Sequence, residues 1–171
     1  MIDWNEFKNN LKKYFENYTA RDEGDAAKYI ADQYELAVLN GEDILWKNSI
    51  VTYQKKLLEK TIETAFKLAK KTNNNNMFSN FFSNGIIMYW TGAQLNLIKF
   101  PLGTTGIISN NVINPGTPQV LLVKSTNSVN EFIDNLINFF KLHLLTVGGI
   151  TIAIVPGTPP VPTPFPWQGY S

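Results

Sequence analysis

The stretch SVNEFIDNLINFFKLHLLTVGG, residues 128–149, has the most regular pattern in this chain and sets its expected fold class. Ser128 followed three residues later by Glu131 has the form of a capping box, in which each side chain accepts a hydrogen bond from the other residue's backbone. Gly148 and Gly149 end the pattern, as glycine often does just beyond a helix. Between them, apolar residues recur at helical spacing: Val129, Phe132, Ile133, Leu136, Ile137, Phe140 and Leu144. The stretch therefore predicts an amphipathic helix to about Leu145.

The first 72 residues contain three more stretches with this period. We expect helices over about 3–18 and 22–40, and a third that begins somewhere between 42 and 50 and ends at Lys71. Charged residues four positions apart on the third stretch favour a solvated outer face. The expected caps and ends are Asp3 with Glu6, Asp22 or Asp25, and Asn40-Gly41.

An uncharged stretch follows, from Met77 to Ile98, and it is long enough to raise the question of a membrane span. Seven serine, threonine, asparagine and glutamine residues interrupt it, and an unpaired amide is costly in hydrocarbon. We therefore expect a fourth helix over 78–95 that packs between protein surfaces, and no membrane span.

Residues 101–118 are rich in glycine and proline, which is typical of a long neutral loop. Apolar residues on either side of Asn110-Asn111 predict a short hairpin, and apolar runs predict strands over 119–124 and 150–155. Six of the nine prolines lie between Pro156 and Pro166. This composition predicts a stiff, polyproline-II-like arm over 156–171 whose terminal aromatic residues dock on a partner.

Together these patterns predict a mainly α fold: a helical bundle of about five helices with long loops and a small β-hairpin. The helical domain spans 1–155 with a loop insertion over 101–127, and an extended proline-rich C-terminal arm spans 156–171.

Charge is distributed very unevenly along the chain. The 99 residues from Asn73 onward carry five charges, whereas the first 72 carry twelve of each sign. An average chain of 99 residues would carry about 25. The surface of a domain that is surrounded by water is hydrated mainly through charged side chains. We therefore expect other protein to cover much of the charge-poor half.

The sequence offers no expected catalytic, cofactor-binding or metal-binding residue. Cysteine is absent, and the single histidine, His143, lies within an apolar helical stretch, where we expect it to be packed. Helix capping explains Asp22, Glu23, Asp25 and Asp32 better than a calcium loop, because the alternating ligands and the terminal glutamate are missing. Gly103 to Gly106 lacks the lysine of a phosphate-binding loop. We therefore expect no enzyme activity.

Other binding modes are weakly supported. Fourteen of the fifteen basic residues are lysine and net charge is +1, which disfavours sequence-specific nucleic-acid binding. Two P-x-x-P patterns, at 156–159 and 159–162, leave an alternative open: a monomeric adaptor whose proline-rich tail is bound by a partner domain. The N-terminus does not resemble a signal peptide, so we expect synthesis in the cytoplasm without export.

Several short pieces, taken in order, resemble small structural proteins of the neck and tail rings of tailed bacteriophages, including crAss-like phages. The pieces are YIADQYELAVLNG (29–41), YWTGAQL (89–95), INPGTP (113–118), LHLLTVGGI (142–150) and PFPWQGYS (164–171). The resemblance implies a non-enzymatic virion protein, made in the host cytoplasm, that forms a homo-oligomeric ring at the head–tail junction or along the tail. Its partners would be further copies of itself and other neck or tail proteins, such as the portal.

A ring subunit presents two different faces to its neighbours, which fits a chain with a charge-poor half. On this reading the loop 101–118 and the arm 156–171 supply the contacts between subunits. The residues expected at the interface are Ile107, Ile108, Val112, Ile113, Pro115, Pro162, Phe165, Trp167 and Tyr170.

Overall fold

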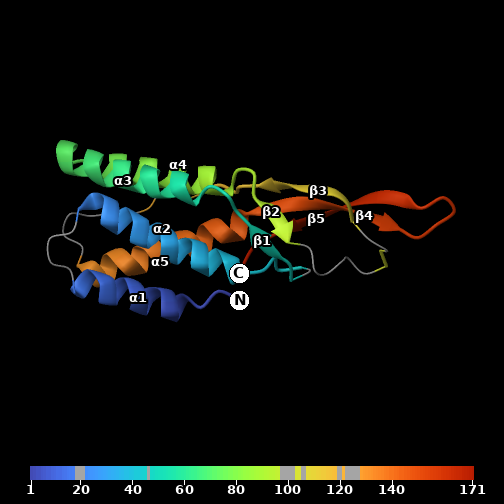
Figure 1. Cartoon of the computed structure of the whole chain (residues 1–171), viewed down its shortest axis with the longest axis horizontal. Coiled ribbons are helices and arrows are strands. Elements are labelled where there is room, and N and C mark those ends of the chain that lie inside the picture. Colours follow the sequence, from blue (N-terminus) through green and yellow to red (C-terminus); the bar gives the residue numbers. More distant parts are fainter. Residues whose placement is uncertain (18–21, 46, 97–102, 105–106, 119–120, 122–127) are drawn as a thin grey trace.

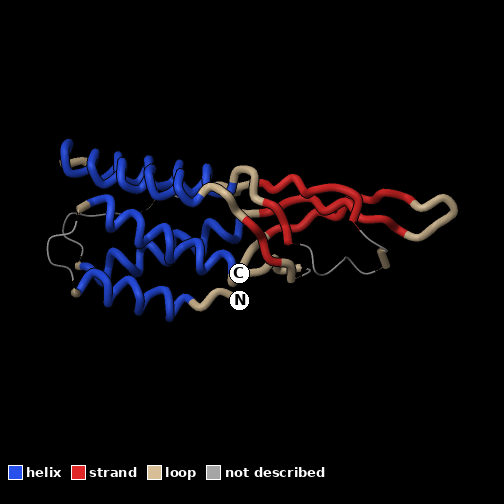
Figure 2. The backbone as a smooth tube through the Cα atoms, in the orientation of Figure 1, coloured by secondary structure: helices blue, strands red, loops and turns tan. Residues whose placement is uncertain are grey.

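The computed structural model describes residues 1–17, 22–45, 47–96, 103–104, 107–118, 121 and 128–171. Within these ranges the chain forms five α-helices gathered in one half of an elongated molecule, and strands fill the other half (Figures 1 and 2). The mainly α prediction is confirmed. The helices are α1 (Trp4–Glu16), α2 (Glu23–Leu39), α3 (Lys55–Thr72), α4 (Asn75–Trp90) and α5 (Val129–Thr146).

Three helices begin at the caps that the sequence predicts. At α5 both halves of the capping box form, because Glu131 N donates to Ser128 Oγ over 3.2 Å and Ser128 N donates to Glu131 Oε2 over 2.7 Å. Asp3 accepts hydrogen bonds from the backbone at the start of α1, and Asp22 accepts one from Asp25 N at the start of α2. Each cap satisfies backbone donors that the first helical turn leaves unpaired.

Aromatic side chains from four helices meet in the core of the bundle. The Phe140 ring of α5 is stacked on Tyr34 of α2, with ring centres 4.2 Å apart, and lies edge-on to Phe7 of α1 at 5.7 Å. Phe82 of α4 approaches the same ring within 5.9 Å. Trp90 donates its indole hydrogen to the Tyr34 hydroxyl over 2.9 Å, which satisfies both polar groups in a buried site.

Among the described residues, five strands form two antiparallel sheets. A small sheet pairs β1 (Ser49–Val51) with β2 (Gln94–Asn96). A larger one has the order β3-β4-β5 and contains β3 (Ile107–Asn114), β4 (Gly148–Val155) and β5 (Val161–Gln168). The β4–β5 hairpin extends away from the helices, so its turn lies at the end of the molecule opposite the C-terminal end of α1 and the α3–α4 connection (Figure 1).

Four sequence predictions need correction: the start of the third helix, the end of the fourth helix, the hairpin around Asn110-Asn111, and the C-terminal arm. The third helix starts at Lys55, because Ile50 lies in β1, and the fourth ends at Trp90, because Leu95 lies in β2. The expected hairpin around Asn110-Asn111 is a single strand, β3, with two irregularities in its pairing to β4. The strand prediction over 119–124 lies outside the described residues apart from Leu121, which is buried.

The fourth correction concerns the C-terminal arm. Residues 161–168 are extended, as predicted, but they pair along their whole length with β4, from Gly148 opposite Gln168 to Val155 opposite Val161. Trp167 and Tyr170 are buried within the chain's own core. The segment 156–171 therefore completes the domain instead of standing apart from it.

In the described part of the chain, no helix combines the length and the apolar character that crossing a bilayer would require.

Candidate assembly surface

The end of the chain is tied to the helical half by its backbone. Glu42 and Ser171 exchange two backbone hydrogen bonds of 2.8 and 3.0 Å, and Tyr170 N donates to Leu144 O over 2.9 Å. The Tyr170 hydroxyl donates to Val38 O over 2.7 Å and accepts from Ile50 N over 3.3 Å. These bonds hold β5, and with it the hairpin, in a fixed direction relative to the bundle.

Gly41 makes this anchorage possible. A Cβ atom at that position would lie 2.4 Å from Cε1 of Tyr170, well inside van der Waals contact. The glycine that ends α2 therefore also leaves the space that the Tyr170 ring occupies.

The loop before α5 is fixed to the C-terminal turn of that helix. His143 Nε2 lies 2.7 Å from the carbonyl oxygen of Pro115, so this nitrogen carries the hydrogen and donates it. Thr117 N donates to Thr146 Oγ1 over 2.9 Å. His143 Nδ1 is buried and has no hydrogen-bond partner among the described residues. Because burial penalises the charged ring, the pKa of His143 is lowered to about 4.

We predict that His143→Gln removes a component of acid sensitivity. An ordinary histidine pKa of 6.5 in the unfolded chain against about 4 in the folded one means that the unfolded chain binds more protons between these values. The stability linked to His143 is therefore complete above pH 6.5 and falls by about 3 kcal/mol as the pH drops toward 4. Urea unfolding at several pH values should show this fall in the natural chain. The glutamine variant, which keeps a donor for Pro115, should lack it; equal slopes would refute the buried neutral ring.

The two faces of the β4–β5 hairpin differ in their burial. Gly149, Thr151 and Ala153 pair with Trp167, Phe165 and Thr163, and this face is mostly covered. The other face holds Ile150, Ile152 and Ile154 opposite Pro166, Pro164 and Pro162. All three prolines are exposed, Ile150 is 44% exposed, and the other two isoleucines are half-buried. We call these six residues the isoleucine–proline face.

The prolines also determine what β5 does at the edge of the sheet. Alternate residues of a strand direct their backbone groups to opposite sides, and proline has no N–H to donate. Pairing with β4 along the whole strand therefore places Pro162, Pro164 and Pro166 with their nitrogens toward the outer edge. From Pro162 to Pro166 this edge therefore has no N–H group to donate, and it is protected against pairing with a further strand. A protein partner can bind the isoleucine–proline face but cannot extend the sheet at this edge.

The interface residues expected from the sequence fall into three groups. Ile107, Ile108 and Val112 lie on β3, but their side chains are outside the described part of the structure. Ile113, Pro115 and Phe165 are half-buried and Pro162 is exposed, so an interface role remains a prediction for them. Trp167 and Tyr170 are wrong as docking residues, because both are buried in their own chain.

Sequence reasoning missed Ile150, Ile152, Ile154, Pro164 and Pro166 as surface residues. A signal for them was available: prolines at every second position fit the period of a strand whose alternate residues face the edge. A free polyproline arm does not need its prolines at every second position, because it has no sheet edge to face.

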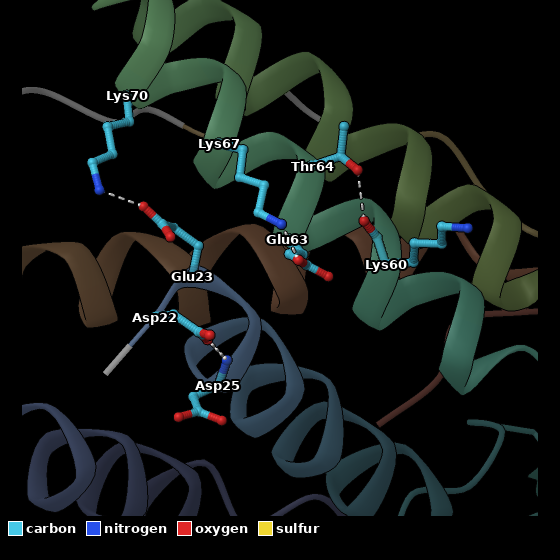
Figure 3. Close-up of polar contacts among 8 residues, drawn as sticks. All are labelled: Asp22, Glu23, Asp25, Lys60, Glu63, Thr64, Lys67 and Lys70. Atoms are coloured by element: carbon cyan, nitrogen blue, oxygen red, sulfur yellow. Dashed lines mark hydrogen bonds and ion pairs between the residues drawn. The ribbon is translucent and has the colours of Figure 1, made fainter. Parts of the chain in front are cut away.

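The aspartates considered for calcium have structural roles in the bundle. Asp22 accepts the hydrogen bond from Asp25 N over 2.8 Å, and Glu23 pairs with Lys70 over 2.7 Å (Figure 3). Asp32 lies 2.9 Å from Lys55. Within the described residues, no three acidic or histidine side chains are grouped as they would be around a metal ion.

Searches against protein-family models, curated proteins and solved structures find no match for this chain.

Proposed function

We propose that this chain is a non-enzymatic structural protein that assembles in multiple copies through its C-terminal sheet. The isoleucine–proline face carries this proposal. It is apolar and open to solvent, and no charged residue occurs after Lys141 in the sequence. Exposed apolar surfaces of this kind mark contacts with other proteins or with membranes. Because polar residues interrupt the uncharged stretch 77–98 throughout, we favour a protein over a membrane as the partner.

The short pieces that resemble neck and tail proteins suggest where such an assembly works. We place it in a ring at the head–tail junction or along the tail of a tailed bacteriophage, with the portal or adjacent ring proteins as neighbours. This placement predicts that purified phage particles contain the chain in more than one copy, which quantitative mass spectrometry of virions measures. A chain found only in infected cells and never in particles would contradict the placement.

The alternative, a monomeric adaptor whose tail is bound by a partner domain, has less support. Pro156 and Pro159 lie in the turn between β4 and β5, and Pro162 is paired within β5. A domain that binds polyproline-II chains would have to separate β5 from β4 before it could engage this segment.

We predict that Ile150→Lys prevents assembly. A lysine at this position places a charge at the centre of an apolar contact, where it loses water without gaining a partner. Leu39→Lys is the matched control, because Leu39 is also 44% exposed but lies on α2. Light scattering should give a smaller particle for Ile150→Lys than for Leu39→Lys, at equal helical circular dichroism. The same particle size for both variants would contradict the proposed use of this face.

A further inference from the structure

An apolar pocket lies at the end of the helical half. Its volume is about 470 Å³, and its walls include four phenylalanines, each from a different helix: Phe15, Phe66, Phe78 and Phe132. Phe66 and Phe78 are 4.9 Å apart between ring centres, and Phe132 lies 6.3 Å from Phe78. All but Phe78 are only half-buried, so the rings present apolar surface that the described part of the chain leaves open.

The rim of this pocket is electrically neutral. Its lysine, Lys70, is paired with Glu23 over 2.7 Å, and the pairing lowers the pKa of that carboxyl group (Figure 3). Asn73, Asn75 and Ser128 supply the remaining polar groups of the lining. An ionic ligand would thus meet no unpaired opposite charge among the lining residues. An uncharged apolar partner is the better match.

An element with these properties lies at the other end of the molecule. The hairpin turn VPGTPPV, residues 155–161, has no charge, and Val161 at its edge is 52% exposed. Its three prolines restrict the backbone, so little conformational entropy remains to be lost on binding. The pocket is formed by the C-terminal ends of α1 and α3 and the N-terminal ends of α4 and α5, which lie far from this turn (Figures 1 and 2). The turn of one copy therefore cannot fill its own pocket.

We propose that the β4–β5 turn of one copy inserts into the phenylalanine pocket of the next. This inference rests on the proposed assembly function and places both surfaces in one contact: the turn enters the pocket, and the isoleucine–proline face of the same hairpin lies against the same neighbouring copy. A convex element at one end and a concave one at the other form a heterologous contact, which leaves one turn and one pocket free after each addition. Such contacts produce a closed ring when their rotation closes and a filament when it does not. The turn has no charge and the charged group of the pocket lining is paired, so burying the two surfaces against each other leaves no unpaired charge.

The test uses glutamate substitutions on both sides of the contact. Val129 lines the pocket, is 44% exposed, and lies in the first turn of α5, where an acidic residue suits the helix dipole. Val129→Glu and Val161→Glu should each abolish assembly at concentrations at which the unchanged chain assembles. Met88→Glu, at a residue that is 45% exposed and outside both elements, should assemble normally. Circular dichroism and thermal unfolding establish that each variant is folded.

Mixtures of the variants give the decisive result. In an equimolar mixture of Val129→Glu and Val161→Glu, only the unchanged turn of the first can enter the unchanged pocket of the second, so the product stops at a dimer. In a mixture of Val129→Glu and Val161→Lys, opposite charges meet at the altered contact, so larger assemblies should return. Mass photometry distinguishes these products.

Each alternative outcome has a definite meaning. Loss of assembly by Val161→Glu but not by Val129→Glu would overturn the pocket as the partner, while the proposed assembly through the sheet would stand. Products of the same mass from the Glu–Glu mixture and from the Glu–Lys mixture would also overturn the pairing of turn and pocket. An unchanged chain that stays monomeric would contradict the proposed function itself, and this inference with it.

Discussion

Tyr170→Ala is expected to lower the free energy of unfolding by about 3–5 kcal/mol, as substitution of a buried large aromatic residue does. The Tyr170 side chain is 1% exposed and lies edge-on to Trp90, with ring centres 5.4 Å apart. Its removal leaves a cavity beside Gly41 and takes the hydroxyl partner from Ile50 N and from Val38 O, of which the latter keeps a hydrogen bond from Gly41 N. Urea unfolding followed by circular dichroism measures the loss.

Two further variants separate the contributions at this site. Tyr170→Phe keeps the ring and should cost about 1–3 kcal/mol, which is the range for leaving buried polar groups unpaired. Deletion of residues 156–171 removes β5, Trp167 and Tyr170 together and should leave a chain without a cooperative unfolding transition. If the truncated chain kept its helical signal and unfolded cooperatively, the segment would be a docking arm and its burial here would be wrong.

Phe140→Ala is expected to cost a similar 3–5 kcal/mol, because this ring lies where four helices meet. It is fully buried and contacts aromatic rings of α1, α2 and α4. Phe66→Ala is the matched comparison, since Phe66 is a phenylalanine that is half-buried at the wall of the pocket. Its removal should cost about half as much, because less apolar surface returns to water.

The comparison is made by denaturant unfolding of both variants under the same conditions. Equal midpoints for the two variants, with unchanged slopes, would contradict the placement of Phe140 at the centre of the core and of Phe66 at its edge.

The helices of this fold could be predicted because their signals are local. A period of 3.6 residues, together with capping residues such as Asp22 and Ser128, depends on neighbours within four positions of the chain. The predicted ends were therefore close to the observed ones for α1, α2 and α5.

The strands were harder because their partners are distant in sequence. Ile50 fits the apolar spacing of the helix that follows it, and only its pairing with Leu95 places it in a strand. Asn110 and Asn111 have the composition of a turn, yet β3 continues through them with a shift in register, because it pairs with β4 on either side, at Ser109 and at Val112. In both cases tertiary pairing overrides the local preference.

Of the six residues of the isoleucine–proline face, Pro162 alone was predicted from the sequence as an interface residue. The scarcity of charge in the C-terminal half can be read from composition without a structure, and an interface role for that half stays a prediction. Which residues of β5 face solvent depends on its register with β4, and that register assigns Pro162 to the exposed face and Trp167 to the covered one.

The central claim is that the chain assembles in multiple copies, and its mass in solution tests this most directly. Sedimentation of the unchanged 19.3 kDa chain over a wide concentration range should reveal a discrete particle whose mass is a multiple of the single chain. A single species of 19.3 kDa at every concentration, including the highest, would contradict the account.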